Sequence, residues 1–228
     1  MEKEKKGLKS LFVFSVREIA GISVLTALAV VLAEAFHIPI FPIVSFLEYD
    51  MADIPIFLGT FMYGPFAGII MTIVVSVIQG VTVSAGGGWI GIVMHIFATG
   101  LYVVSAGFIY YKHKTIKGAL VSIGVGIIVW MVGMILWNIV LTPLYMGVPR
   151  QAVIDLLGYI AAFNAIKVVA NSVATILLYK RLKRFFVFVS NKVEKSIKNK
   201  KRNENLEKEP KELPEGENNL SESEHNNE

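Results

Sequence analysis

Three polar side chains interrupt the apolar stretch from Leu156 to Tyr179. Asn164 lies three residues before Lys167 and Asn171 lies four residues after it, so on a helix the three share one face. A lysine at the centre of a membrane helix costs about 2.5–3.5 kcal/mol on insertion scales and marks a functional site by default. The pattern therefore predicts that Lys167 and Asn164 face a polar cavity. The structural alternative is that the asparagines bridge helices and Lys167 pairs with a carboxylate.

Three further polar residues lie in apolar stretches. Asn138 can face the same cavity or form a hydrogen bond to a neighbouring helix. Glu34 comes late in the first apolar stretch, where we expect it to reach the outer interface. His95 has no second histidine, cysteine or carboxylate at ligand spacing in the sequence. We interpret it as a core histidine and predict no metal site.

Catalytic motifs are absent from the sequence. It contains no GxxxxGK[ST], no HExxH and no GxSxG, and Gly86-Gly87-Gly88 neither follows a soluble strand nor opens a phosphate-binding helix. We therefore predict a protein that is not an enzyme and has no ATPase motif of its own. A membrane enzyme or a membrane assembly protein remains the alternative from another class.

Composition points to a membrane protein. The chain has 228 residues, is 54% hydrophobic and contains no cysteine. Its polar residues are concentrated beyond residue 190, so the remaining body is more apolar than an ordinary soluble core. This excludes a cytosolic enzyme, a disulfide-stapled secreted domain and a zinc-cysteine module, and it argues against a nucleic-acid partner.

The body divides into apolar runs separated by prolines, glycines and charges. The first run reaches roughly 27 Å as a helix, enough to cross a bilayer core. We predict an all-α integral membrane protein of six transmembrane helices. The six runs are Ile19–Phe36, Ile54–Met62, Phe66–Val81, Trp89–Tyr111, Ala119–Leu141 and Leu156–Tyr179.

Lysine and arginine set the expected orientation. They cluster in residues 3–17, 112–117 and 180–184, whereas the other loops hold only Arg150. The positive-inside rule then places both termini in the cytoplasm. We expect a cytoplasmic segment over 1–16, a membrane domain over 17–184 and a mostly disordered polar tail over 185–228.

Four stretches carry a resemblance to a known family. The chain resembles the substrate-binding (S) components of energy-coupling factor (ECF) transporters, and among them the riboflavin-specific branch. The matching stretches are Phe46-Leu-Glu-Tyr-Asp-Met-Ala-Asp-Ile-Pro55, Tyr63-Gly-Pro65, Trp137-Asn-Ile-Val-Leu-Thr-Pro-Leu-Tyr145 and Phe163-Asn-Ala-Ile-Lys167. One departure is His95 in Gly91-Ile-Val-Met-His95, where the family pattern has an asparagine.

The resemblance implies a vitamin-capturing module of an ABC importer in the cell membrane. It would take riboflavin as transported ligand rather than cofactor, with FMN as a second candidate ligand. It would pass the vitamin inward with a transmembrane coupling protein and two ATP-binding subunits. The alternative within the family is another vitamin, such as pantothenate or folate.

The resemblance also implies two sets of residues. We expect the flavin ring to be bound by Lys167, Asn164 and Asn138, whose donors and acceptors match its edge. The other expected ligand contacts are Leu47, Tyr49, Asp50, Met51 and Gly87. Small residues spaced by four on the first helix form the expected docking surface for the coupling protein, namely Ser23 with Ala27 and Ala29 with Ala33.

Overall fold

The fold is described by a computed structural model covering residues 13–83 and 88–208. The chain divides into two compact units, Met1–Phe186 and Val187–Glu228. The candidate ligand-binding site lies entirely in the first unit.

The first unit opens with helix α2, Val16–Ala35. Ser15 and Glu18 form a capping box, which satisfies backbone N–H groups at the start of the helix. One stripe of α2 is buried, including Leu25 and Ala29, while much of the opposite side is exposed. This is the pattern of a helix that packs on one face only.

A short hairpin follows α2. Strands β1, His37–Pro39, and β2, Glu48–Asp50, pair antiparallel, with the 3-10 helix η1, Pro42–Val44, between them. The sequence predicted only a proline-rich loop here, because three-residue strands leave no alternating pattern. Val44 and Leu47 from the connection pack against Val153, Ile160 and Phe163, so the hairpin covers the start of the last helices.

Helices α3, Asp53–Tyr63, and α4, Pro65–Val81, come next. Gly64 separates them at φ +101°, a conformation that a side chain disfavours. Residues 53–61 of α3 are all buried, as expected for a helix that is apolar all round. This short helix therefore forms the centre of the first unit.

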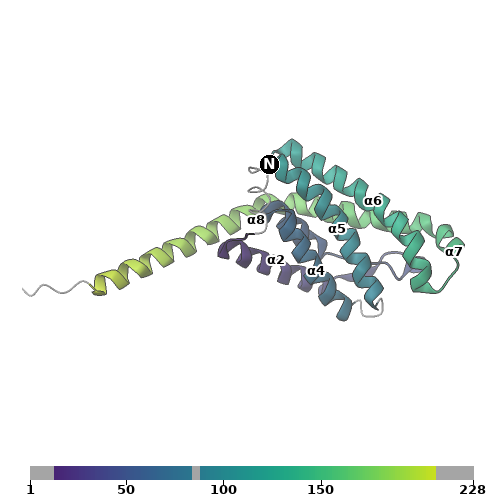
Figure 1. The fold of residues 1–228 in the computed structure, drawn as a ribbon, viewed down its shortest axis with the longest axis horizontal. Coiled ribbons are helices and arrows are strands. Elements are labelled where there is room, and N and C mark those ends of the chain that lie inside the picture. Colours follow the sequence, from purple (N-terminus) through teal and green to yellow (C-terminus); the bar gives the residue numbers. More distant parts are fainter. Residues whose placement is uncertain (1–12, 84–87, 209–228) are drawn as a thin grey trace, which may run out of the picture. The chain divides into compact units, whose positions relative to one another are not determined.

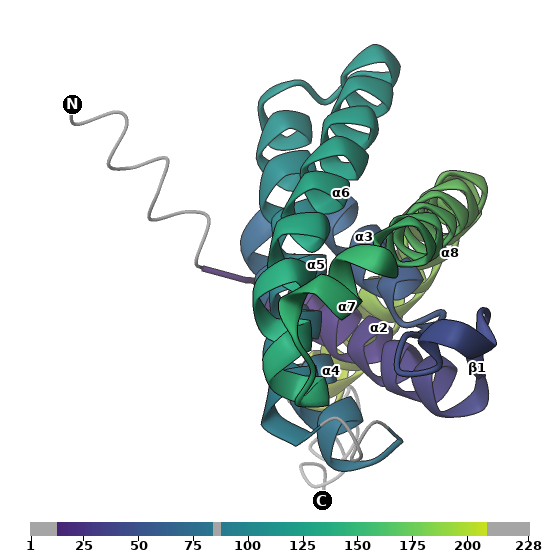
Figure 2. The same cartoon turned by 90° about the vertical axis from the view of Figure 1, so that its right-hand side faces the viewer.

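The remaining helices are α5, Gly88–Lys112, α6, Ile116–Met146, α7, Arg150–Asp155, and α8, Leu157–Lys208. Helices α5 and α6 run side by side (Figure 1). Figure 2 looks onto the end of this unit that carries α7 and β1.

Within residues 13–83 and 88–208, four helices are long and apolar enough to cross a membrane: α2, α5, Ile116–Leu144 of α6 and Leu157–Tyr179 of α8. Helix α4 is apolar but shorter, and α3 has only 11 residues. At 1.5 Å per residue, α3 covers roughly 17 Å, well short of a bilayer core. The mainly helical membrane fold is confirmed, whereas six spans and the side on which the termini lie stay predictions.

Two helix ends differ from expectation. Helix α6 runs past Pro143 to Met146 and ends at Gly147, whose left-handed backbone donates its N–H to the Pro143 carbonyl. Proline lacks a backbone N–H, so in the last turn it removes only one helix hydrogen bond, and the other bonds allow the helix to continue. Residues 185–208, which the sequence assigned to a mostly disordered tail, continue helix α8, and this segment contains many lysines and glutamates, which are strong helix formers. Residues 209–228 lie outside the described residues.

Candidate functional site

A cavity of about 460 Å³ lies between the hairpin and helices α4, α5, α6 and α8. Its volume falls in the range of small-molecule sites. Apolar and aromatic side chains supply part of the lining, among them Met94, Trp130 and Phe163. Polar side chains from several elements converge on the same space, which gives it the chemistry of a binding site.

Lys167 pairs with a carboxylate while it lines this cavity. Its Nζ donates to Asp50 Oδ2 at 2.8 Å and lies 3.9 Å from Asp53 Oδ2. All three residues are buried. The cavity and the ion pair, posed as alternatives by the sequence, therefore occur together.

Asp50 is held ionised at the end of β2. Burial opposes its ionisation, but the Lys167 ammonium, together with hydrogen bonds from Lys167 and the Ala52 N–H, outweighs burial and lowers the pKa of Asp50 from 3.8 to about 2. The hairpin is thus tied to α8 by a charge-assisted bond.

Asn171 bridges elements rather than facing the cavity. Its Nδ2 donates to Asp53 Oδ2 at 3.2 Å and to the Asp50 carbonyl at 3.3 Å, and its Oδ1 accepts from the Tyr49 hydroxyl at 2.9 Å. Burial raises the pKa of Tyr49, so its hydroxyl keeps the proton it donates. The structural alternative is confirmed for this asparagine.

Asn164 occupies the cavity wall one turn before Lys167. It accepts from Trp130 Nε1 at 3.1 Å and donates to the Ile160 carbonyl at 2.9 Å. An amide carries two N–H groups and two oxygen lone pairs, so half of its hydrogen-bonding capacity stays available to a bound molecule.

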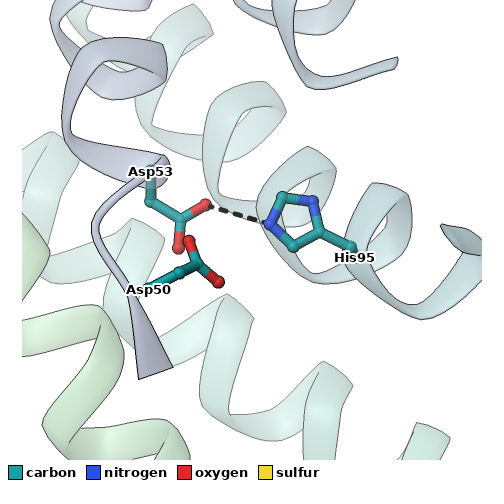
Figure 3. Close-up of side chains that lie close together, drawn as sticks. All are labelled: Asp50, Asp53 and His95. Carbon is teal, nitrogen blue, oxygen red and sulfur yellow. Dashed lines mark ion pairs between the residues drawn. The ribbon is translucent and has the colours of Figure 1, made fainter. Parts of the chain in front are cut away.

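His95 stands opposite, on α5. Figure 3 shows its ring pointing towards the carboxylates of Asp53, in the first turn of α3, and Asp50. Nε2 lies 3.9 Å from Asp53 Oδ1, and Nδ1 lies 2.7 Å from Ser76 Oγ. Asp53 Oδ1 also accepts from the Thr99 hydroxyl at 2.7 Å.

The grouping of His95 with two aspartates corrects the argument, made from sequence spacing, that His95 has no possible co-ligand nearby. The sequence shows no partner near His95, yet the fold brings Asp50 and Asp53 so close that the three possible ligand atoms lie within 4.8 Å of one another. The Lys167 ammonium already neutralises the Asp50 carboxylate. A lysine so placed disfavours a metal ion by repulsion, and the absence of a metal site stays a prediction.

The predicted ligand contacts divide into three groups. Leu47, Asp50, Asn164 and Lys167 line the cavity. Tyr49, Met51 and Asn138 are not among the described residues that line it. Asn138 is buried and satisfied within α6, donating to the Met134 carbonyl and accepting from the Thr142 hydroxyl. Gly87 lies outside the described residues.

The two small-residue pairs on α2 have different surroundings. Ala29 and Ala33 are buried in the main core, so their stripe is covered by the chain itself. This pair is therefore not available for the docking that we expected of it. The sequence could not show this, because the spacing of small residues does not distinguish internal packing from an external contact. Ser23 and Ala27 are exposed and accessible to a partner.

Sequence reasoning missed Gln79 as a cavity residue. Gln79 is buried on α4, lines the cavity and donates to Asp50 Oδ2 at 3.2 Å. The signal was present, because a glutamine in the apolar run Phe66–Val81 is as unusual as the asparagines of the last helix.

Known proteins resemble this chain over most of its length. Residues 17–179 match the family described as "ECF transporter, substrate-specific component". The riboflavin transporter RibU of Staphylococcus aureus (strain TCH60) is 30% identical over 177 residues, covering 74% of this chain and 92% of the relative. The riboflavin transporter FmnP of Bacillus subtilis (strain 168) is 27% identical, covering 74% of this chain and 93% of the relative.

A solved structure resembles the fold as well. It comes from work on the "Structure and mechanism of the S component of a bacterial ECF transporter". It superposes with a TM-score of 0.65 at 31% sequence identity, covering 74% of this chain and 96% of that one.

Proposed function

Because the chain belongs to the family of substrate-specific components of ECF transporters, we propose that it is the riboflavin-binding subunit of such an importer. It is a multi-pass bacterial membrane protein. The observation that carries the proposal is the cavity of about 460 Å³, in which Lys167 and Asn164 meet an aromatic and apolar lining. The similarity to two riboflavin transporters supports the choice of vitamin.

The cavity wall on α8 suits the polar edge of a flavin ring. That edge alternates acceptor, donor and acceptor atoms. Lys167 has N–H groups beyond the one bonded to Asp50 and can donate to a ring carbonyl, while Asn164 can both donate and accept. Trp130, Met134 and Phe163 can cover the apolar faces of the ring.

The direct test is spectral. We expect the purified protein to carry a yellow ligand, or to quench the fluorescence of added riboflavin with nanomolar affinity. Lys167→Ala should weaken binding at least tenfold, because it removes a charge-assisted hydrogen bond. Lys117→Ala, at an exposed lysine outside the cavity, is the matched control. Failure of the unsubstituted protein to bind any flavin would contradict the proposal.

Transport needs partners, since the sequence has no ATPase motif. We propose that a transmembrane coupling protein docks on the exposed Ser23–Ala27 stripe of α2 and that two ATP-binding subunits drive the cycle. The proposed topology has six membrane segments with both termini in the cytoplasm. The ligand is cargo rather than a cofactor, and FMN is a second proposed cargo.

A further inference from the structure

The basic residues of the chain gather in a segment that lies beyond the last membrane helix. Residues 180–202 contain a single acid, Glu194, and ten basic residues, namely Lys180, Arg181, Lys183, Arg184, Lys192, Lys195, Lys198, Lys200, Lys201 and Arg202. Residues 203–228 reverse the balance, with nine acids and two lysines. The positive-inside rule accounts for the basic residues at 180–184, directly after the last apolar run. The group from Lys192 to Arg202 calls for another explanation.

The basic segment is helical, and its residue types alternate with the period of a helix. Helix α8 continues through the segment to Lys208 (Figure 1). Apolar residues recur at spacings of four, three, four and four, which places them on one face of a helix: Leu182, Phe186, Val189, Val193 and Ile197. The same period places five basic residues on the opposite face: Lys180, Arg184, Lys195, Lys198 and Arg202. Residues 180–202 therefore have the pattern of a basic amphipathic helix.

This pattern fits the surface of a bilayer. Arg181, Arg184, Lys195 and Lys198 are exposed. A helix with an apolar face and a cationic face binds in the plane of the membrane interface, with its apolar side chains at the acyl boundary and its charges among the headgroups. Clusters of lysine and arginine directly after a membrane helix are attracted by anionic lipids. Both halves of the pattern are thus complementary to one partner.

We propose that residues 180–202 form an interfacial helix that binds the anionic lipid surface of the bilayer that the first unit spans. The inference goes beyond the proposed function and does not depend on the vitamin. Lipid is favoured over an acidic protein because the last membrane helix delivers the segment to the bilayer surface, where acyl chains can bury the apolar face. In the bound state the chain turns near the boundary of the two compact units, between Phe186 and Val187.

The test uses the full-length protein in nanodiscs with an environment-sensitive fluorescent label. The chain contains no cysteine, so one introduced cysteine carries the only label. Val193→Cys places the label on the apolar face, and Asn191→Cys, which the helical period places on the basic face, is the matched control. Each labelled protein is measured in discs of phosphatidylcholine alone and in discs that also contain anionic phosphatidylglycerol.

We expect the label at Val193→Cys to emit at shorter wavelength in the anionic discs and to be protected there from acrylamide, a neutral quencher in water. In phosphatidylcholine discs the same label should emit as it does in water. The label at Asn191→Cys should stay accessible to acrylamide in both lipids. Salt at about 1 M, where the Debye length is roughly 3 Å, should reduce the shift.

Removing charge from the basic face should release the helix. The triple variant Lys195→Gln, Lys198→Gln and Arg202→Gln keeps the apolar face and good helix formers. It should lower the ratio of bound to free segment roughly a hundredfold and so remove the spectral shift.

The control loses the same charge elsewhere. Lys112→Gln, Lys114→Gln and Lys117→Gln, at exposed lysines around the connection from α5 to α6, should leave the shift intact.

A shift of equal size in both lipids would overturn the inference, because the apolar face would then have an occupant other than anionic lipid, such as the acidic end of the chain. A shift in neither lipid would overturn it as well. Riboflavin quenching measured on the same discs separates these results from the proposed function. Riboflavin binding without a lipid-dependent shift contradicts only the interfacial helix, and the shift without riboflavin binding contradicts only the proposed function.

Discussion

Lys167 and Asp50 depend on one another because neither can reach bulk water easily. Both are buried, and their charges are 2.8 Å apart. Breaking such a pair by removing one partner is far more costly than replacing both, because the remaining charge stays buried. The pair is therefore a structural element of the cavity as well as a proposed ligand contact.

A double-mutant cycle measures this dependence. Lys167→Met should lower the free energy of unfolding in detergent by about 3–5 kcal/mol, because it leaves the Asp50 carboxylate unpaired. Adding Asp50→Asn should recover part of that loss. Lys117→Met, at an exposed lysine, should change stability by less than about 0.5 kcal/mol. Strict additivity of the two substitutions would contradict the coupling.

Acid should weaken the fold through Asp50. Its pKa is lowered from 3.8 in the unfolded chain to about 2 in the folded protein. The stabilisation is therefore fully present above about pH 4 and is lost as the pH falls from 4 towards 2. Unfolding curves recorded between pH 7 and pH 2 should show this loss, and Asp50→Asn should lack this contribution. If Asp50→Asn lost as much stability in acid as the unsubstituted protein, the loss would come from other groups.

At the scale of elements, the cavity depends on how closely α4 approaches α5. Gly80 lies where a Cβ atom would come within 2.1 Å of Ile92 Cγ1 on the facing helix. That atom lies near the Ile92 backbone, so it cannot swing away as the end of a long side chain would. Glycine here allows the two walls to meet at the edge of the cavity.

Gly80→Ala should lower the free energy of unfolding by about 1–3 kcal/mol because of overpacking, and it should weaken riboflavin binding. Gly100→Ala in α5 is the matched control, since a Cβ atom there meets nothing within 4 Å. It should be neutral or stabilising by up to about 1 kcal/mol through helix propensity. Thermal unfolding measures both, and equal effects would contradict the packing argument.

Helix α2 provides the proposed docking face. Ala27→Trp places a bulky ring on the exposed stripe with Ser23, where it should block close approach of another helix. Cells that depend on this transporter should lose riboflavin uptake, while the purified variant still binds riboflavin. Val140→Trp, at an exposed position of α6, should leave uptake intact. Normal uptake by Ala27→Trp would remove α2 as the docking helix.

At the scale of the whole molecule, the distribution of basic residues predicts which loops face the cytoplasm. The chain contains no cysteine, so each introduced cysteine is a unique label. Lys114 and Arg150 are both exposed and lie on opposite sides of the membrane in the proposed topology. On intact cells, a membrane-impermeant maleimide should label Arg150→Cys and not Lys114→Cys. Permeabilised cells should allow both to react, and the reverse pattern would invert the topology.

The sequence predicted the helices better than it predicted the site. Apolar runs place the helix boundaries within a few residues, except at Pro143 and beyond residue 184, where local hydrogen bonds and helix propensity prevail. The short helix α7 lies between two runs and was not predicted. Lys167 and Asn164 were found because polar residues in an apolar run are costly. Their partners, Asp50 in the hairpin and Trp130 in α6, could not be predicted. Spacing along one helix carries no information on contacts with other elements.

The bond between Asp50 and Lys167 joins residues 117 positions apart, which has a consequence for biosynthesis. The hairpin and α3 leave the ribosome long before Lys167 does. Until then Asp50 and Asp53 have no lysine to neutralise them, and a carboxylate without a cation is costly to bury. We therefore expect these two side chains to stay in water while the earlier helices assemble. The cavity is closed only when α8 arrives, so a chain released before that point has helices but no site.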